Sequence, residues 1–295
     1  MVAAYRDEDV ECGSGKDAND ENFPVGSFLI RADLRPHIAK FYAFARAADD
    51  IADSGQLTPG DKLKRLNAYE DVLSGTATGL SKPEALRTSL LETKISLEHG
   101  INLLAAFKQD AQKQRYHSLE DLLAYCRLSA NPVGRYLLDL HGESPELYPA
   151  SDALCTSLQI LNHFQDCGED RKALDRAYIP LDWLREEGET LDALDRQVLS
   201  PGFRRVMDRL LDVCDRLNTD GEALEGKLES RRLAAESGVI TRLAKRLSAR
   251  LRAGDPLANR IALSKADFAA AAWGGAIAGL VRPYFRPRAR KKVAV

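Results

Sequence analysis

The stretch FYAFARAADDIADS, residues 41–54, decides how the rest of the chain is interpreted. Its aromatic residues, alanines and isoleucine are typical of a buried helix, but it also carries these polar side chains: Tyr42, Arg46, Asp49, Asp50 and Asp53. Because each residue turns an α-helix by about 100°, these side chains share one stripe. A solvent-facing stripe is one interpretation. Short aspartates favour helix ends over interiors, so they favour the alternative, which is a binding site.

A second acidic stretch, SLQILNHFQDCGEDRKA, covers residues 157–173. Asn162, Asp166 and Asp170 are spaced so that on a helix they lie within about 80° of one another, and Gln159 falls in the same arc. A buried unpaired carboxylate is costly, and oxygen ligands with few nitrogen or sulfur partners suit Mg²⁺ and its phosphate substrates. The sequence therefore predicts two facing ladders that hold Mg²⁺ ions around a diphosphate, with Mn²⁺ as the alternative ion.

The composition limits the class of protein. Of the 295 residues, 44% are hydrophobic and 29% are charged, which is typical of a globular chain. The 42 basic and 44 acidic residues nearly cancel, so no nucleic-acid partner is expected. Scattered cysteines without a CxxC pair, and no signal peptide, indicate a reduced, cytoplasmic protein. No stretch approaches the roughly 20 apolar residues that a membrane-spanning helix needs.

Helical periodicity runs through most of the chain, and runs of Val, Ile and Thr with period two are absent, so no sheet is expected. Helices are predicted at residues 34–53, 59–75, 82–108, 119–140, 148–173, 202–226, 231–254 and 264–281. We expect an all-α protein with long helices around a common centre. Residues 1–20 are predicted to form a flexible tail, 21–281 a single all-α domain, and 282–295 a basic tail.

Several blocks together resemble the squalene/phytoene synthase family. DDIAD at residues 49–53 and NHFQDCGED at 162–170 resemble its two aspartate-rich motifs. YCRLSANPVGRYLLDL at 125–140 is similar to its Tyr-Cys block, and ENFPVGSFLI at 21–30 stands where the family contacts substrate. DRAYIPLDWL follows the second motif in the family's order. The resemblance implies an isoprenoid-synthase type helical bundle with a central cavity.

The resemblance also implies roles for individual residues. The metal ligands would be Asp49, Asp50, Asp53, Asn162, Asp166 and Asp170. Contacts to the substrate and its diphosphate would come from Asn22, Phe23, Arg46, Gln159, Asn162, Arg260 and Lys265. The catalytic group would be Tyr42, Arg46, Tyr125 and Asn131, with a water held near Tyr125 or Asn131. Gln165 departs from the family, because many members have arginine there.

Within the family, the blocks are most similar to the subgroup that converts presqualene diphosphate and water to hydroxysqualene in bacterial hopanoid biosynthesis. A prenyl diphosphate substrate is therefore expected, with pathway neighbours that make presqualene diphosphate and reduce hydroxysqualene. Condensation of two prenyl diphosphates, by a presqualene diphosphate, squalene or phytoene synthase, is the alternative. A non-catalytic scaffold is the remote alternative, since it would be expected to lose the aspartates. CGSGKDA is not a GxGxxG fingerprint, so no NADPH is expected.

The C-terminal region combines an apolar run with a basic one. FAAAAWGGAIAGL at residues 268–280 is followed by VRPYFRPRARKK at 281–292. This order predicts peripheral contact with the inner face of a membrane, with the basic residues facing anionic lipid. The alternative is a last core helix followed by a solvated tail.

Overall fold

The computed structural model describes residues 3–12 and 30–281. The α-helices are α1 (Asp7–Val10), α2 (Arg35–Asp53), α3 (Pro59–Ser74), α4 (Ser81–Thr93), α5 (Glu98–Asp110), α6 (Leu119–Ser129), α7 (Asn131–His141), α8 (Tyr148–Gln165), α9 (Cys167–Leu174), α10 (Leu181–Glu186), α11 (Pro201–Gly221), α12 (Ala223–Lys227), α13 (Arg231–Ala253) and α14 (Lys265–Val281). Short 3-10 helices are η1 (Pro145–Leu147) and η2 (Leu191–Asp195). The predicted all-α fold is confirmed.

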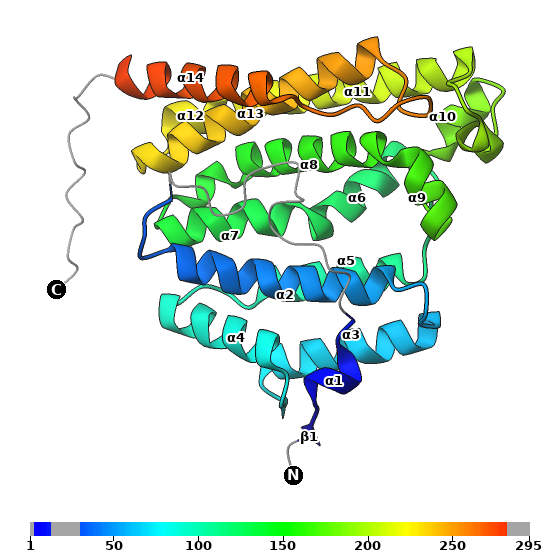
Figure 1. Cartoon of the computed structure of the whole chain (residues 1–295). Coiled ribbons are helices and arrows are strands. Elements are labelled where there is room, and N and C mark those ends of the chain that lie inside the picture. The colour runs from blue at the N-terminus through cyan, green and yellow to red at the C-terminus, as the bar shows by residue number, and fades with distance from the viewer. Residues whose placement is uncertain (1–2, 13–29, 282–295) are drawn as a thin grey trace.

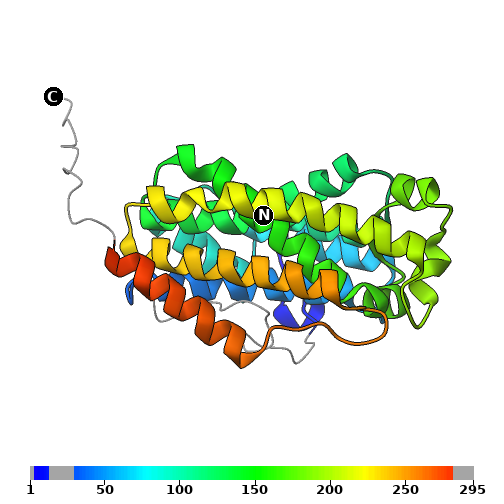
Figure 2. The ribbon, with the colours of Figure 1, turned by 90° about the horizontal axis from the view of Figure 1, so that it is seen from above.

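The helices stack in layers (Figure 1). At one side α3 and α4 pack under α2 and α5, the next layer holds α6, α7 and α8, and α11, α13 and α14 form the opposite side. Viewed from above, α11 and α13 run alongside each other and α14 crosses at an angle (Figure 2). Two buried apolar clusters hold the layers together: one includes Phe44, Leu66 and Tyr69, and the other includes Phe164 and Phe203.

Contacts at both ends of α8 show that α13 runs in the same direction. Just before α13 begins, the backbone N–H groups of Glu229 and Ser230 donate to the carboxylate of Glu143, which lies before α8. Beyond the other end of α13, the carbonyl of Ile261 accepts a hydrogen bond of 2.6 Å from Nε2 of Gln165, the last residue of α8. The loop between α13 and α14 therefore reaches the end of α8, where the second acidic motif lies.

Four of the predicted long helices are each broken into two, and the one predicted at 202–226 divides into α11 and α12 after Gly221. The break between α4 and α5 begins at Lys94, which adopts a left-handed φ of 59°. The break between α6 and α7 falls at Ala130, because Pro132 lacks an N–H and suits a helix start. The break between α8 and α9 falls at Asp166 itself, with φ −104° and ψ 6°. Asp166 and Asp170 are therefore not on one continuous helix with Asn162.

Small strands are present where no sheet was expected. Strand β1 (Ala3–Ala4) pairs in parallel with β2 (Ala77–Thr78), and β3 (Arg115–Tyr116) pairs in parallel with β4 (Ala177–Pro180). Strands this short carry no readable period of two, so the sequence pattern does not reveal them. Within residues 3–12 and 30–281, no helix is both long and apolar enough to cross a membrane.

Residues 3–12 differ from the predicted flexible tail. Besides pairing through β1, they contribute Val10, which is buried, and Glu11, which accepts a hydrogen bond of 2.7 Å from the Tyr69 hydroxyl. Arg65 donates to the carbonyl of Val10 at 3.0 Å. The segment thus packs on α3, and Glu11 contributes one of its acidic side chains to that contact. Residues 1–2, 13–20 and 282–295 of the predicted tails lie outside the described residues, and the single domain over 21–281 stays a prediction.

Candidate active site

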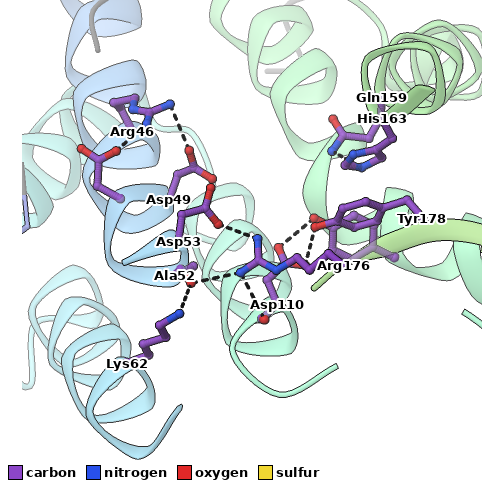
Figure 3. Close-up of polar contacts among 12 residues, drawn as sticks. Arg46, Asp49, Ala52, Asp53, Lys62, Asp110, Gln159, His163, Arg176 and Tyr178 are labelled. Atoms are coloured by element: carbon purple, nitrogen blue, oxygen red, sulfur yellow. Dashed lines mark hydrogen bonds and ion pairs between the residues drawn. The ribbon is translucent and has the colours of Figure 1, made fainter. Parts of the chain in front are cut away.

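The first acidic motif occupies the last two turns of α2 (Figure 3). Arg46 Nη1 lies 3.0 Å from Asp49 Oδ2, and Arg46 Nη2 lies 2.5 Å from Asp50 Oδ1. Spacings of three and four residues place these groups on one helix face, as the periodicity predicts. Arg46 therefore neutralises part of the charge, while Asp49 and Asp53 face the neighbouring elements.

Asp53 pairs with a cation from far along the chain. Arg176 is buried, and its Nη1 lies 2.5 Å from Asp53 Oδ1. Its Nη2 donates to the carbonyls of Ala52 at 3.0 Å and of Asp110 at 3.3 Å. Burial alone opposes the charge of Arg176, but Tyr178, Asp53 and Asp110 outweigh burial and raise its pKa. Arg176 directly precedes the buried strand β4, which holds it in place.

Asp110, the last residue of α5, is a buried carboxylate with a donor on each oxygen. The Tyr125 hydroxyl donates to Oδ2 at 2.8 Å, and the Tyr178 hydroxyl donates to Oδ1 at 3.0 Å. Burial raises the pKa of Asp110 to about 6, although Arg176 and the two hydroxyl groups act in the opposite direction. The three residues form a polar base beneath the first motif.

The second motif lies opposite the first. The pKa of Asp170 on α9 is raised to about 7, first by burial and then by the negative charges of Asp166 and Asp53. Burial and the charge of Asp53 also raise the pKa of Asp49 to about 8, against the effect of Arg46. Because Asp53 belongs to the first motif and acts on Asp170 in the second, the structure brings the two motifs together.

His163 joins the site although the sequence pattern did not place it there. Gln159 Nε2 donates to His163 Nε2 at 3.0 Å, and the His163 ring stacks on Tyr178 with 3.5 Å between ring centroids (Figure 3). Burial and the charge of Arg176 lower the pKa of His163 to about 3, so its ring is neutral at physiological pH. Gln159 is thereby fixed at the polar end of α8.

An apolar cavity of about 310 Å³ lies beside the turns of α2 and α8 that precede the acidic motifs. It corresponds to the central cavity expected from the sequence. Its walls include Phe41 from α2, Leu158 from α8 and Ile240 from α13. Tyr42 and Asn162 line the same cavity; Tyr42 lies about two helical turns before Asp49 on α2, and Asn162 lies about one turn before Asp166 on α8. The arrangement suits a molecule with an anionic head and a long hydrocarbon body.

Other predicted site residues are placed differently. Tyr125 and Asn131 are buried, and Asn131 Oδ1 accepts from the Thr156 hydroxyl at 3.0 Å; neither is among the described residues that line the cavity. Arg260 and Lys265 are exposed, one in the loop between α13 and α14 and the other at the start of α14. That loop contacts Gln165, so it lies beside the second motif. Asn22 and Phe23 lie outside the described residues.

The residues that the sequence pattern missed carry weak signals. Arg176 stands before AYIP, an uncharged stretch that is fully buried as β4, so a buried arginine could have been suspected. Asp110 and Lys62 have no motif around them, and only the fold brings them to the end of α2.

The carboxylates fit a divalent cation in their chemistry. Within residues 3–12 and 30–281, no group of His, Cys, Asp or Glu side chains converges closely enough to form a metal site by itself. Burial and the negative charge of Asp53 raise the pKa of both Asp49 and Asp170, so a cation bound between the motifs would favour their ionised forms. Mg²⁺ keeps several waters and is commonly shared between one or two carboxylates and a substrate phosphate, which this donor set allows.

Comparisons with known proteins agree with this geometry. The sequence profile named squalene/phytoene synthase matches residues 16–267. A hydroxysqualene synthase from Rhodopseudomonas palustris is 41% identical over 277 residues, which cover 93% of this chain and 94% of the relative. A hydroxysqualene synthase from Zymomonas mobilis is 40% identical over 256 residues, 86% of each protein.

Two solved structures are similar in fold. Squalene synthase HpnC from Alicyclobacillus acidocaldarius superimposes with a TM-score of 0.70 and 34% identity, covering 78% of this chain and 87% of that one. A dehydrosqualene synthase in complex with ligand has a TM-score of 0.73 at 17% identity, covering 88% of this chain and 92% of that one, which shows the fold alone.

The stacked helices, the apolar cavity and the paired aspartate motifs define an isoprenoid synthase fold. More narrowly, the chain belongs to the squalene/phytoene synthase family. The family predicted from the motifs is thereby confirmed.

Proposed function

We propose that this protein is a hydroxysqualene synthase, which converts presqualene diphosphate and water to hydroxysqualene and diphosphate. One observation carries the proposal: the apolar cavity reaches Tyr42 on α2 and Asn162 on α8, which lie about two helical turns before Asp49 and one turn before Asp166. A hydrocarbon body would lie in the cavity while the diphosphate lies between the motifs. The relatives from Rhodopseudomonas palustris and Zymomonas mobilis that bear this name support the choice within the family.

Mg²⁺ would be held by Asp49, Asp53, Asp166 and Asp170, with Asp50 and Asn162 beside them. When bound, it supplies positive charge that stabilises the departing diphosphate. The protein adds its own cations at the same end, because Arg46 and Arg176 already lie within ion-pair distance of the first motif. These preplaced charges favour the ionised state of the substrate without reorganising during the reaction.

The cavity wall protects the cation that remains after the diphosphate leaves. Phe41, Leu158 and Ile240 offer no nucleophile, so the cation can rearrange before it is captured. Capture then joins a water oxygen to carbon, and the water proton passes to diphosphate or solvent. Tyr125 or Asn131 stays the proposed water-orienting residue, although neither is among the described residues that line the cavity and their side chains are bonded to Asp110 and Thr156.

The decisive assay is incubation with presqualene diphosphate in ¹⁸O-water without NADPH. We expect a C30 alcohol with one labelled hydroxyl, and no activity in excess EDTA. Squalene formed only with NADPH would identify a complete squalene synthase. Conversion of farnesyl diphosphate alone to presqualene diphosphate would identify the first half-reaction. Either outcome overturns the proposal.

Substitutions test the acidic site directly. Asp53→Asn and Asp166→Asn should each remove most activity and keep their helical content, because each removes a charge from the space between the motifs. Asp220→Asn, on the exposed side of α11, is the matched control and should keep full activity. Equal activity of Asp53→Asn and Asp220→Asn would place the reaction elsewhere.

We also propose that α14 contacts the inner face of a membrane. Ala271 is buried on the side of α14 that packs on α13, whereas Phe268 is 37% and Trp273 is 73% exposed. The sequence from 268 to 281 carries no charge, and six basic residues follow between 282 and 292. Full-length protein should sediment with anionic vesicles at low salt, and Trp273→Ser or deletion of 282–295 should weaken this. Equal sedimentation of all three forms would refute the contact.

A further inference from the structure

We propose that Lys62 on α3 is a positioning residue for the first acidic motif, which fixes the last turn of α2 and counters the charge gathered there. The inference rests on the proposed function, because it takes the acidic end as the reaction site. No motif of the sequence marks Lys62, and only packing of α3 beside α2 brings it there.

Lys62 acts on the backbone at the end of α2. Its Nζ donates to the carbonyl of Ala52 at 2.8 Å, and Arg176 Nη2 donates to the same oxygen at 3.0 Å (Figure 3). The last carbonyls of a helix have no partner within the helix and need outside donors. Where α3 ends at Gly75 in a left-handed cap, α2 ends at Ser54 with a φ of −56°. Two cationic side chains thus donate hydrogen bonds to a carbonyl at the end of α2, as backbone N–H groups do in the cap of α3.

The position is electrostatically unfavourable for a lysine unless it serves the site. Burial, and then the charge of Arg176, lower the pKa of Lys62, while Asp53 and Asp110 oppose that effect. A long lysine side chain on a surface helix can turn its ammonium group to water. Lys62 instead points inward toward a second cation, and the nearby carboxylates compensate the repulsion.

Lys62 and Arg176 make different contacts at the C-terminal end of α2. Arg176 bonds the Asp53 carboxylate directly, whereas Lys62 donates to the backbone carbonyl of Ala52. Lys62 can therefore hold the end of α2 while the Asp53 carboxylate changes partners. Without Lys62, the last turn should open more often, and Asp53 should be less well placed to help bind a metal–diphosphate group.

Three variants test this role. Lys62→Met removes the donor and the charge, Lys62→Arg keeps both, and Lys64→Met is the matched control because Lys64 is exposed on the same helix. Calorimetry with Mg²⁺ and inorganic diphosphate should show a Kd raised about tenfold in Lys62→Met, the scale of one lost charge-assisted hydrogen bond. Lys62→Arg should recover most of the affinity, and Lys64→Met should match the wild type.

Hydrogen exchange gives a readout that does not depend on turnover. Amides of residues 50–54 should exchange faster in Lys62→Met and at the wild-type rate in Lys64→Met. In kinetics, KM for presqualene diphosphate should rise more than kcat falls. If Lys62→Met does not fold, Lys62→Gln, which also removes the charge, decides in its place by the same measurements.

Two results would overturn the role of Lys62: wild-type diphosphate affinity and exchange rates in Lys62→Met, or a loss in Lys62→Arg as large as in Lys62→Met. Failure of the proposed function is distinguishable. In that case the wild type does not convert presqualene diphosphate, while the calorimetric and exchange comparisons of the variants still decide whether Lys62 positions the motif.

Discussion

Replacing Arg176 by glutamine should destabilise the ligand-free protein. The guanidinium lies under the surface, with only 5% of the residue exposed, and it joins α2, α5 and β4 through Asp53 and the carbonyls of Ala52 and Asp110. Glutamine is shorter and uncharged, so it cannot keep these contacts together. The Asp53 carboxylate would lose its partner, and Asp110 would lose the positive charge that favours its ionised form.

The size of the effect follows from the contacts. A hydrogen bond to a charged group contributes about 1.5–3 kcal/mol, and Asp53, at 36% side-chain exposure, falls at the low end because water screens it. The Ala52 carbonyl keeps Lys62 as a donor, so its loss is small. Together with the Asp110 carbonyl, we expect a loss of about 3 kcal/mol. For a chain of this length that lowers the unfolding temperature by about 6 °C.

Circular dichroism during heating measures this, with Arg127→Gln as the control, because Arg127 is exposed and pairs only at the surface with Glu120. The loss should be larger at about pH 8 than at about pH 5, because protonation of Asp110, with a pKa of about 6, removes the unpaired charge. The same loss in both variants, or a loss that does not change with pH, would refute the reasoning.

Two further results are expected. Asp49 and Asp170 have pKa values raised from 3.8 to about 8 and about 7, so their favourable contribution to folding is complete below about pH 4 and declines with rising pH until it is lost above about pH 8. The unfolding temperature of the ligand-free protein should therefore fall between about pH 4 and 8, and less so in Asp49→Asn. A Cβ at Gly134 would lie 2.3 Å from Ser151 Oγ beside the cavity. Gly134→Ala should therefore lower the free energy of unfolding in urea by about 1–3 kcal/mol and raise KM. Gly226→Ala, with open space around it, should change neither quantity.

The fold could be predicted from periodicity, and so could the break at Pro132, but the other breaks in the helices could not. Apolar residues at helical spacing locate α2, α8, α11 and α13, because each long helix must bury one face. Pro132 signals the kink before α7. Lys94 gives no such signal, since a left-handed conformation is normally taken by glycine. Asp166 gives none either, so the second ladder was expected on one straight helix.

At the candidate site, local spacing was informative and long-range pairing was not. The positions of Arg46, Asp49 and Asp50 on one face follow from residue spacing alone. Arg176 and Asp53 are 123 positions apart, and no local rule connects them. Tyr125 was expected beside a water, but its hydroxyl is bonded to Asp110, whose burial only the packing of α5 determines.

The direction of the long helices has a consequence for the field inside the cavity. Both α2 and α8 bring their C-terminal ends to the acidic region, while the cavity lies along their preceding turns. Each helix end carries about half an elementary charge, negative at the C-terminus. The electric potential therefore falls along the cavity toward its polar end. A carbocation formed there would be drawn back to that end, so helix polarity, along with individual side chains, would select the carbon nearest to incoming water.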